Sequence, residues 1–351
     1  MVDFLACNFL AKTKLEAARC QLFYLRGGAH REVKRLRSGH KTRNTGQSAM
    51  NQESPRFSGG ECQFRDKLAM RVKAKSRGIL VPEFVHVLNH DAIRRYMESI
   101  PAPWLIKPRS EAAAIGIKKA ERPDQTWNLL EELGDRQSFY VLEQFVPGDI
   151  YHVDSIVSER EVIFAVPHKY GQTPMDVAHE GGIFTSRNIS RESPDGEALI
   201  ALNRELIEGL GLVRGVTHTE FIKGRDDGRF YFLETSSRVG GANIAELVEA
   251  ATGINLWAEW AKIEISGSEY HLPQRRNDSA GIIISLARQE RPDTSAYDDP
   301  EVVWRLNKNH HAGIIVASPD SQRVEQLLEQ YRRRFYEDFF ASEPLPDKPV
   351  A

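Results

Sequence analysis

Two glutamates on neighbouring predicted strands carry the strongest chemical signal in this sequence of 351 residues. The segments GVTHTEFI (215–222) and FYFLET (230–235) alternate as strands do, and they bracket the turn RDDGR. Glu220 and Glu234 could then face each other, with β-carbons about 4.5–5.5 Å apart. Two opposed carboxylates repel unless a cation lies between them, and Mg²⁺ prefers such oxygen ligands. The pair therefore indicates a magnesium site that also holds substrate phosphates.

The register of this hairpin decides which side chains meet. We expect Ile222 to pair with Phe232 across a five-residue loop, Arg225–Arg229, which places the two glutamates opposite each other and His218 opposite Ser236. Strict alternation also places the second glutamate on the same face as Phe232. Without a metal, repulsion should raise the pKa of one carboxylate. The alternative is that one glutamate lies on a solvated face, because a slip of one residue turns the whole face over.

An arginine and a pair of glycines follow the second strand, in SSRVGGANI. A glycine-rich entry into a helix presents backbone N–H groups, and Arg238 adds a fork of donors, so phosphate or carboxylate could bind there. The alternative for Gly240 and Gly241 is ordinary turn geometry.

Two lysines and two loops could contact or cover phosphates. Lys107 ends the predicted strand WLIKP, and the following loop, Ser110–Gly116, could fold over a ligand together with residues 171–182. Lys67 lies near the start of a predicted helix, in RDKLAM. Taken singly, each lysine could equally be a solvated surface residue.

The segment FYVLEQFVPGD could bind a nucleoside. Glu143 closes a predicted strand, and the apolar Phe145 and Val146 beside it could present backbone groups to a flat base. Asp149 could accept hydrogen bonds from ribose hydroxyls. The alternative is a polar strand terminus without a ligand.

An α+β arrangement with several antiparallel hairpins and no internal repeats would position these residues. We expect helices over residues 65–78, 92–99, 126–133, 197–210, 244–251, 256–265 and 323–335. We expect strands over residues 84–87, 104–107, 139–145, 150–157, 162–166, 215–222, 230–235, 281–286 and 313–317.

Residues 1–62 differ from the rest of the chain in charge and texture. They hold 11 Lys and Arg against 5 Asp and Glu, together with all 3 cysteines. A short helix over 11–25 is possible, and residues 26–60 indicate linker or disorder because they lack periodicity. A basic arm for nucleic acid is the alternative, but aromatic residues are not interleaved with its charges.

Composition narrows the class of protein. Hydrophobic residues make up 41% and charged residues 27%, which suits a soluble globular chain of two or three domains. No apolar run reaches the roughly 20 residues of a membrane span, and the N-terminus lacks a signal-peptide pattern. A net charge of −2 gives no reason to bind nucleic acid. The cysteines lack metal-type spacing, so we expect a reducing cytoplasm.

The order of these segments resembles the ATP-grasp superfamily over residues 64–267. The segments are RDK…VPEF, WLIKPRSEAAAIGIKK, YVLEQFVPGDIYHVDSIV, and GVTHTEFI followed by GRFYFLETSSRVGGANI. The last looks closest to carboxylate–amine ligases of the L-amino-acid ligase type, and it is similar to biotin carboxylase and D-alanine–D-alanine ligase. The resemblance implies an α+β ATP-grasp fold, with two subdomains gripping a nucleotide, over residues 63–270. Residues 271–351 would complete it, and residues 1–62 would be an atypical, largely disordered segment.

The resemblance also implies roles for individual residues. Nucleotide contacts would fall on the phosphate lysines Lys67 and Lys107, on Ser110 of the lid loop, on the adenine hinge Glu143, Gln144, Phe145 and Val146, on the ribose acid Asp149 and on the apolar floor Leu233. Metal contacts would fall on Glu220, Glu234 and Ser236, the last standing where the family usually has Asn. Arg238 and His218 would act catalytically at the transferred phosphate.

The implied activity is an ATP-dependent ligation of a carboxylate to an amine through an acyl phosphate, with Mg²⁺ and possible use of Mn²⁺. The partners would be small-molecule carboxylates and amines in the cytoplasm, with a possible homodimer and without nucleic acid or membrane. Family members carry an α/β domain before the RDK helix, which would be missing or replaced here, and many have glycines where this lid loop has alanines. The alternatives are an ATP-binding protein without ligase activity, a biotin-carboxylase-like carboxylase, and a scaffold that kept only the fold.

Overall fold

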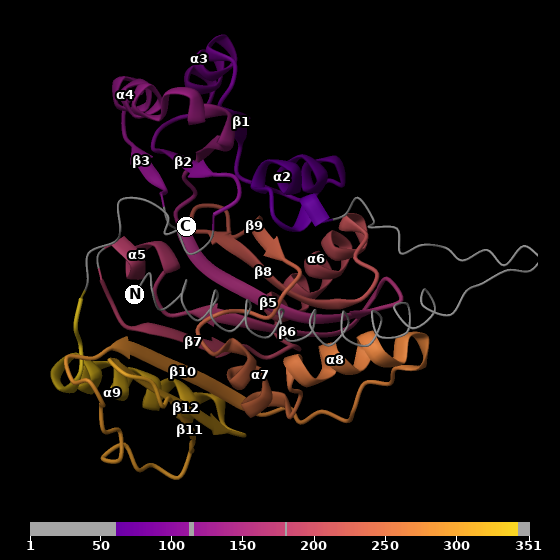
Figure 1. Cartoon of the computed structure of the whole chain (residues 1–351), viewed down its shortest axis with the longest axis vertical. Helices are drawn as coiled ribbons and strands as arrows, with labels where there is room; N and C mark the ends of the chain where they lie inside the picture. The colour runs from indigo at the N-terminus through magenta and orange to yellow at the C-terminus, as the bar shows by residue number, and fades with distance from the viewer. Residues whose placement is uncertain (1–60, 112–115, 180, 343–351) are drawn as a thin grey trace, which may run out of the picture.

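The computed structural model describes residues 61–111, 116–179 and 181–342. The predictions for residues 1–60 and for the middle of the lid loop lie outside these ranges. The described residues form two antiparallel sheets with helices packed on them, the smaller sheet at the top of Figure 1 and the larger below it. None of the helices in these ranges is long and apolar enough to cross a membrane.

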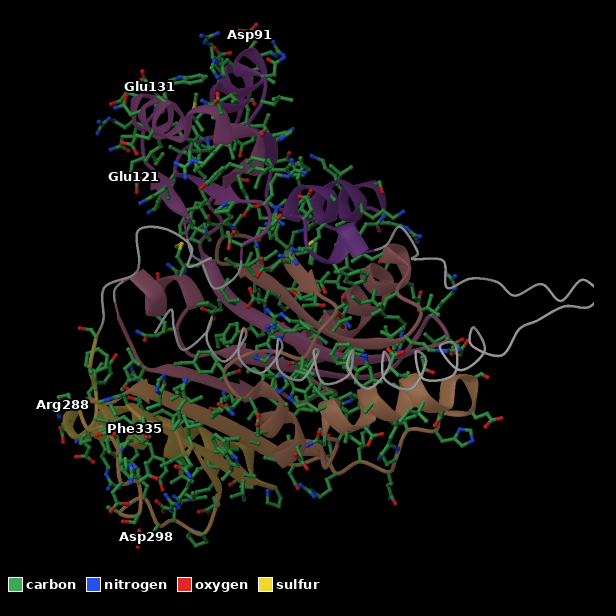
Figure 2. All side chains as sticks on the ribbon, in the orientation of Figure 1. Asp91, Glu121, Glu131, Arg288, Asp298 and Phe335 are labelled. Atoms are coloured by element: carbon green, nitrogen blue, oxygen red, sulfur yellow. The ribbon has the colours of Figure 1, made fainter. Side chains whose placement is uncertain are left out.

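The small sheet has four strands and is covered by two helices. In spatial order, the strands are β1 (Phe84–His86), β4 (Tyr140–Gln144), β2 (Trp104–Pro108) and β3 (Lys118–Ala120). Helices α3 (His90–Ser99) and α4 (Pro123–Leu133) bury Ile93 and Leu130 in one apolar cluster with the strands. Their exposed acids, such as Asp91, point outward at the far end of this lobe (Figure 2).

The large sheet is one antiparallel ladder of eight strands. In spatial order, they are β11 (Val302–Arg305), β12 (His311–Ser318), β10 (Ser279–Leu286), β7 (Phe184–Asn188), β6 (Glu161–Tyr170), β5 (Gly148–Ser158), β8 (Gly215–Gly224) and β9 (Phe230–Ser236). Strand β10 pairs with β7, so the C-terminal strands continue the same sheet rather than forming a separate one.

Helices cover both faces of the large sheet. They are α2 (Lys67–Ser76), α6 (Pro194–Leu210), α7 (Ile244–Thr252), α8 (Leu256–Ser266) and α9 (Ser321–Asp338). Because side chains alternate along a strand, Phe221 of β8 packs with α2 and α6, while its neighbour Ile222 packs with α7 and α8. In β10, Ile282 packs on the α7 side and Ile283 on the α9 side. Burial on both faces explains why β10, with the sequence SAGIIISL, contains a continuous apolar run.

Every helix and strand predicted within the described ranges is present, with ends displaced by a few residues. The sequence did not reveal the short strands β3, β7 and β11 or the short helix α5 (Pro174–His179). Segments such as KKA and FTSRN are too short and too polar for alternation to be visible, and pairing with longer neighbours makes them strands. The remaining described elements are the 3₁₀ helices Glu61–Phe64, Gly134–Phe139 and Gly267–Glu269.

Candidate functional site

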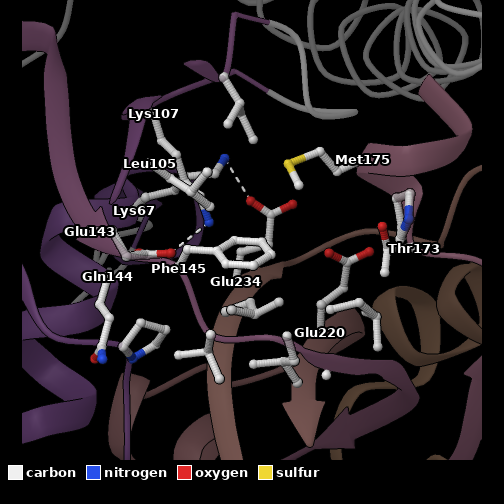
Figure 3. A pocket seen from close by; sticks show the side chains of 18 of the residues that line it. Lys67, Leu105, Lys107, Glu143, Gln144, Phe145, Thr173, Met175, Glu220 and Glu234 are labelled. Atoms are coloured by element: carbon white, nitrogen blue, oxygen red, sulfur yellow. Dashed lines mark hydrogen bonds and ion pairs between the residues drawn. The ribbon is translucent and has the colours of Figure 1, made fainter. Parts of the chain in front are cut away.

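A cavity of about 340 Å³ lies between the small and large sheets (Figure 3). Its walls come from β2 and β4 of the small sheet, from β8 and β9 of the large sheet, and from α2 and α5. Many residues predicted to bind nucleotide or metal meet there. They are Lys67, Lys107, Glu143, Gln144, Phe145, Val146, Glu220, Leu233 and Glu234.

Each of the two lysines is paired with a glutamate (Figure 3). Lys107 Nζ lies 2.5 Å from Glu143 Oε1, and Lys67 Nζ lies 2.6 Å from Glu234 Oε2. Burial by itself would raise the pKa of both carboxyls, but the adjacent cations outweigh it and lower both pKa values. The rise in pKa predicted for one carboxylate of the facing pair is therefore not found at Glu234, because the Lys67 ammonium lies against it.

The N-terminus of α2 is fixed against the small sheet, which sets where Lys67 points. Asp66 caps the helix by accepting from the Leu68 N–H at 2.9 Å, and its carboxylate also pairs with Arg109, just after β2. The Lys67 N–H donates to the Arg109 carbonyl at 2.8 Å. These contacts join α2 to β2, so both lysines reach the same cavity.

The predicted register is confirmed at the site and wrong near the turn. The two glutamates are directly paired, as are His218 and Ser236. Ile222, however, pairs with Tyr231 rather than with Phe232. The cause is a β-bulge, in which β9 has one extra residue opposite β8.

The extra residue is Leu233, and it changes which face Glu234 occupies. Phe232 packs into the core beneath α2 and α6, whereas Leu233 and Glu234 both line the cavity. The expectation that Glu234 shares a face with Phe232 is therefore wrong, because a bulge places two successive side chains on one side. This irregularity brings the predicted base floor and the predicted metal carboxylate to the cavity together.

Glu220 is held differently from Glu234. The Tyr170 hydroxyl donates to Glu220 Oε1 at 3.0 Å, and His218 Nε2 lies 3.6 Å from the same oxygen. Burial and the charge of Glu220 raise the pKa of Tyr170 well above its usual range. The hydroxyl therefore stays protonated and acts as the donor.

A buried network behind Glu220 orients His218. Asp154 accepts from His218 Nδ1 at 2.8 Å and from His152 Nδ1 at 2.7 Å, and His168 Nδ1 lies 3.3 Å away. Burial lowers the pKa of His152 to about 3. Burial also tends to lower the pKa of His218, but the carboxylates of Asp154 and Glu220 outweigh it and raise this pKa to about 9. His218 is thus an imidazolium at neutral pH.

The same groups are close enough together to suggest a metal centre, since ligand atoms of His152, Asp154 and His218 lie within 4.8 Å of one another. Their N–O separations of 2.7 and 2.8 Å are those of hydrogen bonds between imidazole N–H groups and a carboxylate. We therefore interpret the cluster as a hydrogen-bonded network that holds His218 beside Glu220.

Arg238 and Ser236 adjoin this region without lining the cavity. Arg238 is partly buried and donates to the Val239 carbonyl at 2.9 Å. Burial lowers the pKa of Arg238, and the charges of Glu234 and Glu220 oppose the shift. The guanidinium therefore interacts electrostatically with both carboxylates, and its catalytic role stays a prediction. The metal role of Ser236 stays a prediction.

Two backbone N–H groups of the predicted adenine hinge already donate hydrogen bonds within the protein. The Gln144 N–H donates to the Glu83 carbonyl at 2.8 Å, and the Phe145 N–H donates to the Pro103 carbonyl at 3.0 Å. The side chain of Glu143 is buried against Lys107 rather than turned toward a base. A hinge role thus rests on other backbone groups of this segment.

Two of the predicted nucleotide-binding residues, Asp149 and Ser110, do not line the cavity. Asp149 is exposed and pairs with Lys169 at 2.6 Å, whereas its neighbour Ile150 lines the cavity, as alternation along β5 requires. Ser110 is exposed and lies outside the cavity wall. Their ribose and phosphate roles stay predictions.

Sequence reasoning missed Arg71, Asp154 and Tyr170. Arg71 lies four residues after Lys67, so both occupy one face of α2, and this spacing was a usable signal. His152 and Asp154 are two apart on one strand, which also marks a shared face. For Tyr170, the sequence offered no signal, because its approach to Glu220 depends on the order of strands in the sheet.

The donor set at Glu220 and Glu234 fits a hard divalent cation. Two carboxylates stand directly opposite each other, and a cationic group, the Lys67 ammonium, already lies against one of them. Oxygen ligands from two carboxylates, completed by substrate phosphates, are typical of Mg²⁺.

No family model matches the chain. The chain is 24% identical over 208 residues to the L-arginine-specific L-amino acid ligase of Bacillus subtilis. The matched region covers 57% of this chain and 49% of that protein. The chain spans about half the length of the curated relatives it matches first.

Solved structures resemble the chain over more of its length. An L-amino acid ligase from Bacillus licheniformis superposes with a TM-score of 0.61 at 17% identity, over 80% of this chain and 74% of that one. A second similar structure is the biotin carboxylase domain of the 2-oxoglutarate carboxylase from Hydrogenobacter thermophilus, solved with MgADP and bicarbonate. It superposes with a TM-score of 0.60 at 15% identity, over 80% of this chain and 66% of that one. These likenesses confirm the fold predicted from the order of the sequence segments.

Proposed function

We propose that this chain, which has the ATP-grasp fold, is an ATP- and Mg²⁺-dependent ligase that joins a carboxylate to an amine through an acyl phosphate. The observation that carries the proposal is the convergence of two lysines and two directly opposed glutamates on one cavity. The relative with an L-amino acid ligase name supports amino acids as the first substrates to test.

The cavity would offer apolar surface to a base and ammonium groups to phosphates. Leu233, Val146 and Ile150 line it with apolar surface that suits a purine. Lys67 and Lys107 supply two ammonium groups for phosphate oxygens. A nucleotide that lies between them would displace the lysines from their present glutamate partners.

Glu220 and Glu234 would hold the metal. When bound, Mg²⁺ would neutralise charge on the phosphates and on the two carboxylates. Lys67, released from Glu234, would then be available to the phosphates. Because Mg²⁺ would replace Lys67 at Glu234 while Lys67 moves to the phosphates, each charged group would stay paired before and after the nucleotide binds. This pairing limits the free-energy cost of burying charge.

The reaction consists of two displacements. A carboxylate oxygen of the substrate attacks the γ-phosphorus, and the bond to the bridging oxygen breaks, which yields an acyl phosphate and ADP. The amine then attacks the acyl carbon, phosphate leaves, and the amine loses a proton to give the amide. Arg238 and the imidazolium of His218 would balance the charge that develops on the transferred phosphoryl group.

The test is release of ADP by the full chain with Mg²⁺, ATP and pairs of amino acids. We expect ADP and phosphate to form only when both a carboxylate and an amine are supplied, and ¹⁸O from a labelled carboxylate to appear in the phosphate. Nucleotide binding without turnover for any pair would favour the alternative of an ATP-binding protein without ligase activity.

A further inference from the structure

We propose that Arg71 is a positioning residue that keeps Lys107 available to the phosphates of ATP. It would do so by neutralising Glu143, the carboxylate that otherwise competes for this lysine. The inference rests on the proposed nucleotide site, and it goes beyond it by assigning a role to a buried arginine outside the predicted set.

Arg71 is fully buried and contacts both walls of the cavity. Its Nε donates to Glu143 Oε2 on β4 of the small sheet, and its Nη1 donates to the Leu233 carbonyl on β9 of the large sheet. Only 1% of the Arg71 side chain and 1% of the Glu143 side chain are exposed. Burial of this kind is costly for a charge unless its hydrogen bonds are satisfied, and here two of its nitrogens are bonded.

The two oxygens of Glu143 are divided between two cations. Arg71 takes Oε2, and Lys107 takes Oε1 at 2.5 Å. The three groups carry two positive charges and one negative charge, so the cluster has a net charge of +1 beside the cavity. Without Arg71, Glu143 and Lys107 would form a neutral buried pair, and phosphate would have to break it without any surplus charge to attract it.

The contact with Leu233 connects the same arginine to the β-bulge. Leu233 is the extra residue of β9, and β8 offers it no pairing position. The guanidinium holds its carbonyl, so the bulge has a fixed partner on α2. Since the bulge turns Leu233 and Glu234 to the cavity, Arg71 supports both walls of the site at once.

The bonds of Arg71 to Glu143 and Leu233 are not needed to anchor helix α2. Met70 and Ala74 of α2 are buried and already anchor the helix in an apolar cluster. Replacement of a buried ionic group by an apolar side chain of similar length is often tolerated. The Arg71→Met variant should therefore fold, with Glu143 still paired to Lys107.

The experiment is calorimetric titration of the full chain with ATP and with adenosine in the presence of Mg²⁺. The ratio of the two dissociation constants reports the affinity that depends on phosphate. We expect Arg71→Met to lower ATP affinity at least tenfold and to shrink this ratio. The matched control is Arg77→Met, which removes a positive charge from the exposed end of the same helix, outside the cavity, and should leave the ratio unchanged.

A second variant separates charge balance from general support of the fold. In Arg71→Met with Glu143→Gln, Lys107 no longer has a competing carboxylate, and the net charge of +1 returns. We expect ATP affinity to recover by at least threefold relative to Arg71→Met alone. An unchanged ratio in Arg71→Met, or no recovery in the folded double variant, would overturn the role of Arg71. Failure of the wild-type chain to bind ATP would instead overturn the proposed function.

Discussion

Glu220 and Glu234 stand directly opposite each other on β8 and β9, yet different groups hold them. Glu220 accepts from the neutral Tyr170 hydroxyl at 3.0 Å, whereas Glu234 is paired with the Lys67 ammonium at 2.6 Å. Each carboxylate therefore already has a cationic neighbour, because Lys67 pairs with Glu234 and the His218 imidazolium lies 3.6 Å from Glu220 Oε1. In the proposed function, a divalent cation held by both carboxylates would release Lys67 and so couple metal binding to the freeing of this lysine for phosphate.

Glu234→Gln should separate the metal role from a structural role. The amide removes a ligand charge, so affinity for Mg²⁺–ATP should fall, on the order of tenfold or more. The metal-free protein should also lose roughly 1–3 kcal/mol of stability, because Lys67 loses a charged hydrogen-bond partner. Urea unfolding with and without Mg²⁺–ATP measures both effects, and Glu98→Gln, at an exposed position on α3, is the control. Reduced stability with unchanged Mg²⁺–ATP affinity would make Glu234 a structural ion-pair partner only.

Lys107→Ala should weaken nucleotide binding by removing a charge-assisted contact with phosphate. A loss of roughly 1.5–3 kcal/mol is expected for such a contact. Glu143 would keep Arg71 as its partner, so the fold should survive the change. Titration with ATP is the measurement, and equal affinity for the variant and the wild type would remove Lys107 from the site.

Asp154→Asn should slow phosphoryl transfer without weakening ATP binding. The amide can still occupy the space between the histidines, but it cannot stabilise the imidazolium of His218 as a carboxylate does. If His218 balances charge in the transition state, the rate of ADP release should fall by about 10²-fold at saturating ATP. A variant that loses ATP affinity and keeps its turnover rate would contradict this role for the network.

The buried carboxyl of Glu143 predicts an acid limit to stability. Its pKa is lowered from the ordinary value of 4.5, because Arg71 and Lys107 outweigh the effect of burial. A lowered pKa in the folded state contributes stability that is present above pH 4.5 and is lost as pH falls through the folded value. Glu143→Gln should therefore flatten the acid side of the stability curve measured by urea unfolding. A curve of unchanged steepness would show that the carboxyl is not preferentially charged in the folded protein.

Local pattern was enough to predict the hairpin and the facing glutamates. Alternation and the RDDGR turn define the strands, and the pairing of Glu220 with Glu234 follows from them. The bulge at Leu233 could not be predicted in the same way, because nothing in FYFLET marks an extra residue. Its backbone partner is distant in sequence, because Arg71 of α2 donates to the Leu233 carbonyl.

Contacts between residues that are far apart in sequence could not be predicted from local sequence patterns. Tyr170 reaches Glu220 because β6 and β8 both flank β5, and Arg71 reaches Glu143 because α2 lies between the two sheets. For Asp149, the sequence predicted a site residue that the structure does not bring to the cavity. Its acid type suited ribose, but the parity of β5 turns it toward Lys169 and turns Ile150 into the cavity.

Titration of the full chain with ATP, with and without Mg²⁺, tests the central claim most directly. The opposed glutamates and the two lysines predict that ATP binds and that Mg²⁺ strengthens the binding at least tenfold. Glu220→Gln with Glu234→Gln should abolish the effect of the metal while some ATP binding through the lysines remains. Absence of ATP binding, or binding that is indifferent to Mg²⁺ in the wild type, would contradict the assignment of this cavity as a Mg²⁺–ATP site.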